Sequence, residues 1–411
     1  MNILELETTK KLTDRAKNLF EYCIYAVVIG AAVGFAGACL GKAISFASNL
    51  RSEHEWLICF MPLAGLLIIW LYHLAGVYES LGTNRILSSL KHKDDGLSLR
   101  VAPLIFVSTV LTHLTGGSAG RESAALQLGA SLADYIGRHL KLSHEDMRVI
   151  TMCGMASGFT ALFGTPLAAS VFALEILANK IRYAALLPVF LSSISAKVFS
   201  GFFGAETERY ALSLSPELSP ALIIRLFAAG ILAAFLSMLM CIALDETHIL
   251  YGKIKNPYLR VFIGGVITAC LTMLFGPATY AGAGGHIIAQ AIEGNAPAFA
   301  FLIKILLTAL TLGCGFKGGE IVPTLFVGAA FGAVVGPFIG LDPGFCAALC
   351  MIGNFAGNTN CPLAAIALSV ELFGGECAAC FALVVFLSYT LSGHYSLYAE
   401  QKLMKSRFSI D

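Results

Sequence analysis

The chain has 411 residues, of which 57% are hydrophobic and only 13% carry a charge. Soluble globular domains have about a quarter charged residues, so this composition excludes a soluble domain and indicates a protein embedded in a lipid bilayer. The net charge of +1 gives no support to a nucleic-acid partner.

The N-terminal segment, residues 1–18, is polar and amphipathic, and it predicts a short helix lying at the inner membrane surface rather than a cleaved signal peptide. Basic residues precede the first apolar run and follow the last one: Lys10, Lys11, Arg15, Lys17, Lys402, Lys405 and Arg407. By the positive-inside rule, both ends of the chain are expected in the cytoplasm of a cell whose inner (plasma) membrane it spans. The number of crossings is then even.

Apolar runs recur from residue 19 almost to the end of the chain. A transmembrane helix needs about 17–25 mostly apolar residues. The longest runs are 19–49, 56–78, 101–115, 184–203, 221–244, 259–276 and 296–314. Three others are too short to cross alone, namely 123–136, 167–178 and 362–373. Glycine and proline interrupt them, which predicts half-helices that end at mid-membrane where protein lines a cavity.

The two halves of the chain repeat one another. GMASGFTALFGTPLAASVFALEILA (154–178) matches MIGNFAGNTNCPLAAIALSVELFGG (351–375), and Gly-Arg-Glu at 120–122 matches Gly-Gly-Glu at 318–320. We expect a first transmembrane repeat, an extracellular linker, a second repeat and a C-terminal segment, over 19–203, 204–220, 221–395 and 396–411. An outside linker between two cytoplasmic ends gives each half an odd number of crossings, so the repeats lie in opposite orientations.

Two glutamates occupy equivalent places in the repeats, and charged side chains inside a membrane are costly and usually functional. Glu122 comes just before a helix start, where unpaired amides attract anions, so its carboxylate could fill an anion site and leave it when protonated. Glu320 follows Gly318-Gly319 in the same way. The alternative for both is an ordinary surface glutamate, beside Arg121 and Lys317 respectively.

The two other glutamates of the repeats, Glu175 and Glu371, lie at the ends of their short apolar segments. We interpret them as structural, either interfacial or paired.

An enzymatic alternative rests on Gly116-Gly117-Ser118-Ala119-Gly120, which matches the G-x-S-x-G motif of serine hydrolases. An intramembrane hydrolase also needs a histidine base, and His113 is the one candidate nearby. The second repeat has no equivalent serine, so this function is a distant alternative.

The twelve cysteines stand mostly singly in apolar runs, and Cys377-x-x-Cys380 has no partner pair. Neither a disulfide framework nor a zinc site is indicated. We expect no metal and no cofactor.

In combination, three blocks resemble the CLC family of chloride channels and proton-coupled anion antiporters. GREsaalQLGasla (120–133) is similar to the family's Gly-Arg/Lys-Glu-Gly-Pro motif, and GGEIVPtLFVGAafG (318–332) to its Gly-x-Phe-x-Pro block. SGHYSLYAEQ (392–401) resembles the segment that bears the central tyrosine. The likeness covers about 20–402 and implies an all-α homodimer of inverted repeats, whose broken half-helices meet at an anion site at mid-membrane.

The departures from the family pattern resemble its divergent bacterial branch, which exports fluoride in exchange for protons. Thr83-Asn84 stands at the anion-coordinating segment, Ile176 replaces an inner proton-transfer glutamate, and Gly-Gly-Glu ends at Glu320. The resemblance implies that Glu122 is the gate and proton carrier and that Glu320 couples proton movement. It implies an anion site formed by Thr83, Asn84, Ser123, Ala124, Ile321, Val322 and Tyr398.

The expected function is therefore fluoride/proton antiport, with fluoride and the proton as the transported partners. Fluoride is small and strongly hydrated, so a site for it needs strong hydrogen-bond donors. Transport of chloride, another halide or nitrate, by exchange or through a channel, is the alternative, and Thr83 favours it because the fluoride branch often has Met-Asn there.

Overall fold

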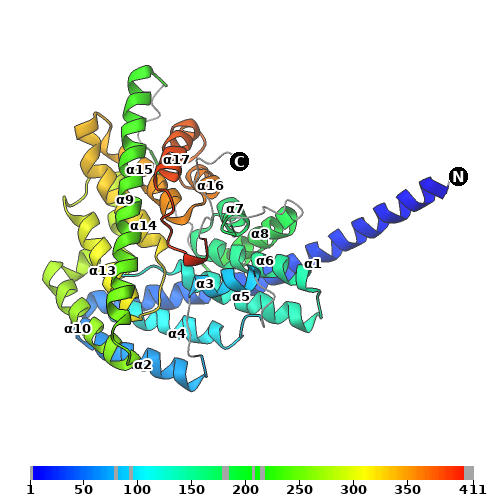
Figure 1. Cartoon of the computed structure of the whole chain (residues 1–411), viewed down its shortest axis with the longest axis horizontal. Helices are drawn as coiled ribbons and strands as arrows, with labels where there is room; N and C mark the ends of the chain where they lie inside the picture. The colour runs from blue at the N-terminus through cyan, green and yellow to red at the C-terminus, as the bar shows by residue number, and fades with distance from the viewer. Residues whose placement is uncertain are drawn as a thin grey trace.

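The computed structural model describes residues 3–77, 82–91, 96–177, 185–205, 209–212 and 218–401, with side chains from residue 19 onward. Within these ranges the chain forms helices and no strand, apart from one isolated bridge between Gly120 and Gly319. Figure 1 shows the helices as one bundle from which the N-terminal end of the first helix protrudes.

The first half of the chain contains α1 (Ile3–Glu53), η1 (Glu55–Phe60), α2 (Met61–Leu74), α3 (Thr83–Lys91), α4 (Val101–Leu114), α5 (Glu122–His139), α6 (His144–Phe163), α7 (Pro166–Glu175) and α8 (Leu186–Phe202). The second half contains α9 (Pro220–Gly252), α10 (Pro257–Phe275), α11 (Pro277–Tyr280), α12 (Gly285–Ile292), α13 (Ala300–Cys314), α14 (Ile321–Val335), η3 (Gly336–Ile339), α15 (Pro343–Thr359), α16 (Pro362–Phe373), α17 (Ala378–Leu391) and η4 (Ala399–Gln401).

Among the residues that the structure describes, five helical segments are long and apolar enough to cross a membrane: Leu19–Glu53, Glu55–Leu74, Pro220–Gly252, Pro257–Phe275 and Ile321–Ile339. The three segments expected to be too short to cross alone form α5, α7 and α16. Helices α7 and α16 have only 10 and 12 residues, as expected. The expectation is wrong for 123–136, because α5 has 18 residues and continues through Gly137, Arg138 and His139 past the apolar run. Two further segments with long apolar runs form helices shorter than a full crossing needs, because α4 and α13 have 14 and 15 residues. Helix α8, with 17 residues, is at the lower limit.

The expected domain boundaries are only partly visible in the structure. Helix α1 runs through residue 18 without a break, so no change of backbone separates the N-terminal segment from the first repeat. Parts of the linker (206–208 and 213–217) and the tail from residue 402 lie outside the described residues. The boundaries between the repeats stay predictions.

Small residues allow the buried helices to pack backbone against backbone. A Cβ atom at Gly328 would lie 2.5 Å from the carbonyl oxygen of Cys350, and one at Gly332 would lie 2.3 Å from that of Cys346. Helices α14 and α15 therefore meet at a distance that only glycine permits. Gly30 contacts the carbonyl of Ser192 in the same way, which brings α1 against α8.

Helices α7 and α16 cap one another across the two repeats. Glu371, in α16, accepts hydrogen bonds from the amides of Leu167 (3.0 Å) and Ala168 (2.8 Å) at the start of α7. Glu175, in α7, accepts the equivalent pair from Leu363 (3.0 Å) and Ala364 (2.8 Å). The bonds are the same in both directions, and they give each glutamate the structural role that the sequence indicates.

We expect Glu371→Ala to lower the midpoint of thermal unfolding of the purified protein in detergent micelles. The substitution leaves the two amides at the start of α7 without an acceptor, at a cost of about 2 kcal/mol. Glu175→Ala should lower the midpoint by a similar amount because of the symmetry. Glu376→Ala, an exposed neighbour, is the control and should leave it unchanged. An unchanged midpoint in Glu371→Ala would contradict the capping role.

Candidate functional site

The starts of α5 and α14 meet inside the bundle. The Gly120 amide donates to the Gly319 carbonyl at 2.6 Å, and the Gly319 amide donates back to the Gly120 carbonyl at 2.7 Å. This reciprocal pair fixes the two half-helices with their first residues adjacent. The unpaired amides of both helix starts are therefore concentrated in one small region, which is a favourable setting for an anion.

The Glu122 side chain crosses from α5 to the start of α14. Its residue is fully buried, and its carboxylate Oε2 accepts a hydrogen bond from the Val322 amide at 3.3 Å. A Cβ atom at Gly319 would lie 2.7 Å from this oxygen and 3.0 Å from the amide nitrogens of Glu122 and Ser123. Only glycine leaves room for the carboxylate there. The alternative of a surface glutamate is wrong for Glu122.

The Glu320 side chain crosses in the opposite direction. It is the N-terminal cap residue of α14, and its Oε2 accepts a hydrogen bond from the Ser123 hydroxyl on α5 at 2.9 Å. The Lys317 side chain packs over a different residue, with its Nζ 5.1 Å from the centre of the Tyr72 ring. Two carboxyl groups thus lie at one junction, and each reaches the other repeat.

A cavity of about 480 Å³ lies beside this junction and is large enough for several water molecules. It is lined by five of the predicted site residues: Thr83, Asn84, Ser123, Glu320 and Tyr398. We call it the anion cavity. The buried hydroxyls of Thr83 and Tyr398 and the Oε1 atom of Glu122 have no hydrogen-bond partner among the described protein atoms. Those of Thr83 and Tyr398 lie where a bound ion or water in the cavity can supply the missing partner.

The C-terminal segment holds Tyr398 against the cavity. The Leu397 amide donates to the Asn358 carbonyl at 2.9 Å, and the Gln401 side chain donates to the Ile176 carbonyl at 3.0 Å. Asn84 accepts from the Glu400 amide at 3.4 Å, which ties η4 to α3. Figure 1 shows this red segment next to α3 and α5. Asn84 thus has a positioning contact as well as a place in the cavity wall.

The other predicted residues lie behind the cavity wall. Ala124, Ile321 and Val322 are buried without lining the anion cavity, and Val322 offers its amide to Glu122. The sequence did not identify four charged or titratable lining residues, Asp245, His248, Arg260 and Lys317. Lys317 was considered only as a partner of Glu320. The first three come from α9 and α10, far from any motif, so no sequence signal could have placed them here.

The hydrolase motif does not form a nucleophile–base pair. The Ser118 hydroxyl lies 3.0 Å from the hydroxyl of Thr308, and its amide donates to Thr311 at 3.1 Å. His113 uses Nδ1 on the carbonyl of Thr109 at 2.9 Å, and its Nε2 has no partner among the described atoms. Ser118 and Thr308 instead join α13 to the loop before Glu122.

Apolar membrane-length helices, two repeats and crossed buried carboxyl groups define a polytopic membrane protein built around a buried polar site. The family model for "Voltage gated chloride channel" matches residues 64–393. A "Chloride/fluoride channel protein" of Pseudomonas syringae pv. tomato is 33% identical over 96% of this chain and 89% of its own length. The chain therefore belongs to the voltage-gated chloride channel (CLC) family.

Solved structures agree with this assignment. "Crystal structure of a CLC-type fluoride/proton antiporter" is 32% identical to this chain, with a TM-score of 0.90 over 93% of this chain and 98% of that one. "X-ray crystal structure of a slow cyanobacterial Cl-/H+ antiporter" shares the fold at 18% identity, with a TM-score of 0.81 over 90% and 94% of the two chains. The all-helical polytopic membrane fold and the family resemblance are confirmed.

Proposed function

We propose that this chain exports fluoride in exchange for protons. The observation that carries the proposal is the crossed pair of carboxyl groups, with Glu122 on the Val322 amide and Glu320 on the Ser123 hydroxyl. The relative named as a chloride/fluoride channel protein and the neighbour titled as a fluoride/proton antiporter support the same function.

In the proposed mechanism, the Glu122 carboxylate blocks the anion path because it occupies the start of α14. Protonation removes its charge, weakens its hold on the amide and frees this position for fluoride. An ionised Glu320 repels fluoride, whereas a protonated one donates a hydrogen bond to it. Anion entry then requires a proton at the same junction, which couples the two movements. Exchange in opposite directions follows if Glu122 releases its proton to the side opposite the anion when it returns to the start of α14.

The second candidate is transport of chloride or another halide, by exchange or through a channel. Thr83 favours it, because its buried hydroxyl lines the anion cavity without a partner and presents a single donor to an ion. A serine hydrolase is not favoured, because Ser118 is bonded to Thr308.

We expect liposomes that contain the purified protein and are loaded with equal fluoride and chloride to release fluoride and take up protons, with little chloride release. Ion-selective electrodes and the external pH follow all three ions. Fluoride is expected to leave faster because a small anion gains most from the strong donors of the site. Chloride release at an equal or greater rate would replace this proposal by the general halide one.

The same proposal includes the surroundings of the chain. We infer that both termini lie in the cytoplasm and that the repeats are inverted in the inner (plasma) membrane, because basic residues flank the first and last apolar runs. We also expect a homodimer with one pathway per subunit. The inner membrane would then supply the proton gradient and the negative potential that drive fluoride out.

A further inference from the structure

One face of α5 carries a line of polar side chains from the buried junction to the end of the helix. Ser123, Gln127, Ser131 and Asp134 are spaced by three or four residues, so they lie on one face. Their exposed fractions are only 2%, 5%, 1% and 5%. The remaining residues between them are glycine, alanine and leucine. A buried polar line through an otherwise apolar membrane helix is costly, which suggests a function.

Three neighbouring cavities follow this line. Ser123 and Gln127 line the anion cavity, and Gln127 and Ser131 line a second cavity of 320 Å³, the middle cavity. Asp134 and Arg138 line a third of 260 Å³, the end cavity. Gly82 and Gln127 belong to both the anion and middle cavities, and Gly96 to both the middle and end cavities.

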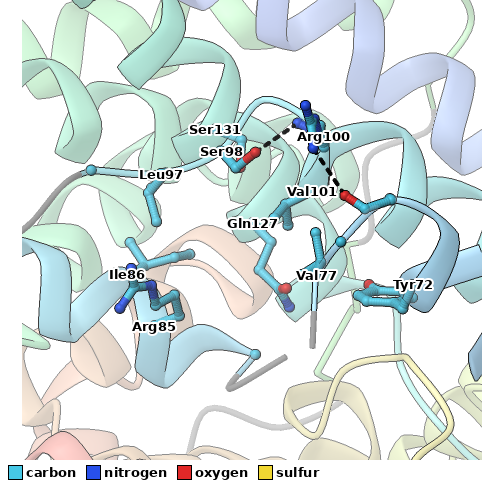
Figure 2. Close-up of a pocket in the computed structure, with 14 residues that line it drawn as sticks. Tyr72, Val77, Arg85, Ile86, Leu97, Ser98, Arg100, Val101, Gln127 and Ser131 are labelled. Carbon is cyan, nitrogen blue, oxygen red and sulfur yellow. Dashed lines mark hydrogen bonds between the residues drawn. The ribbon is translucent and has the colours of Figure 1, made fainter. Parts of the chain in front are cut away.

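Hydrogen bonds join the inner members of the line to the junction. Glu320 accepts from Ser123 at 2.9 Å, and the Gln127 amide group donates to the Ser123 carbonyl at 3.1 Å. Figure 2 shows the Gln127 side chain reaching into the middle cavity from α5, near Val77 and Tyr72. Hydroxyl groups and cavity water can pass a proton by exchanging O–H bonds, so no other bond needs to change.

Asp134 ends the line with a carboxylate that is almost completely buried. Its Oδ2 accepts from Arg138 at 2.7 Å, and the Arg138 side chain is 49% exposed. The other charged or titratable groups that line the end cavity, His144 and Arg148, come from α6. An ion pair on a helix surface does not require a buried carboxylate. A proton acceptor at the inner end of a solvent-connected cavity does.

We propose that this face of α5 is the proton route between the Glu122–Glu320 junction and the solvent at the end cavity, and that it diverges from the anion cavity after Gln127. The proton leaves the Glu320 carboxyl, passes along hydroxyl groups and water by way of Gln127 and Ser131, and binds the Asp134 carboxylate before its release. This inference rests on the proposed fluoride/proton antiport.

The middle cavity is also lined by two cations, Arg85 and Arg100 (Figure 2). Arg100 is bonded to the Ala75 carbonyl at 3.1 Å, at the rim. Cations disfavour a proton that stays in the cavity, so they promote its release. They could equally attract an anion, and a second anion inlet is the alternative that an experiment must distinguish.

The experiment measures fluoride and proton flux in liposomes for Asp134→Asn and Gln127→Leu, each alone and combined with Glu122→Ala. Alone, each is expected to slow fluoride-coupled proton movement by about 10-fold, because proton transfer by positioned groups contributes this much or more. Asp134→Glu should restore most of the rate. In the Glu122→Ala background, anion flux no longer needs a proton, so Asp134→Asn, which lies outside the anion cavity, should leave it unchanged. Ser157→Ala, a buried hydroxyl away from the three cavities, is the matched control.

Three outcomes would overturn the proton route. Wild-type coupled rates in Asp134→Asn would show that the carboxylate is not used. An equal loss of anion flux in the Glu122→Ala background would show that the line serves the anion or the fold. Arg138→Gln matching Asp134→Asn would show that only the ion pair matters. Fluoride movement without proton movement in the wild-type protein would overturn the proposed function itself. The wild-type recording tests this before any variant is compared.

Discussion

Glu122→Gln is expected to abolish fluoride/proton exchange in liposomes, with a rate reduced by roughly 100-fold or more. The amide has the size of the carboxyl group, so it still fits beside Gly319 and the fold is retained. It cannot gain or lose a proton near neutral pH, so it can neither carry protons nor leave the start of α14 on protonation. Fluoride and external pH, recorded together, measure the loss.

The control for this substitution is Glu293→Gln, an exposed glutamate after α12, which should exchange both ions at the wild-type rate. The midpoint of thermal unfolding should be the same in wild type and both variants. Normal fluoride/proton exchange in Glu122→Gln would remove Glu122 as gate and proton carrier. The buried position and the Val322 bond would then be purely structural.

Glu320→Gln is expected to slow coupled exchange by about 10-fold or more, because the proton-transfer role of a carboxyl group is lost. The glutamine oxygen can still accept the Ser123 hydroxyl, so the geometry of the junction is retained. The ratio of protons to fluoride ions, measured from the same traces, should fall together with the rate. A wild-type ratio in this variant would show that Glu320 takes no part in coupling.

Ser123→Ala separates the two functions of this pair. It keeps the Glu320 carboxyl group and removes the hydroxyl that lies 2.9 Å from it. We expect a smaller loss of rate than in Glu320→Gln, since the titratable group remains. If the alanine variant loses as much, the hydrogen bond rather than the titration of Glu320 is what transport requires.

The internal repeat made much of the architecture predictable. Gly120 and Gly318-Gly319 marked where α5 and α14 begin, and Pro166 and Pro362 marked the starts of α7 and α16. Glycine and proline act on the backbone directly, so their effect is local and readable from the chain.

Contacts between the repeats could not be predicted in the same way. Glu175 and Glu371 were interpreted as structural, but nothing in the chain indicated that each caps a helix of the other repeat. The same holds for the crossed bonds of Glu122 and Glu320. Such pairs depend on how two distant helix starts are brought together, and that depends on packing over the whole bundle.

The amino-acid sequence by itself determined that this is a duplicated, all-helical membrane protein with carboxyl groups at two half-helix starts. Composition, period and glycine placement act over a few residues, so they are legible without coordinates. Only the tertiary structure decided that Gly120 pairs with Gly319 and that the hydroxyls of Thr83 and Tyr398 share one cavity. The tertiary structure alone also places three cavities along the polar face of α5. The physical reason is that a cavity is the space between elements distant in the chain, and its walls are set by close packing of all of them.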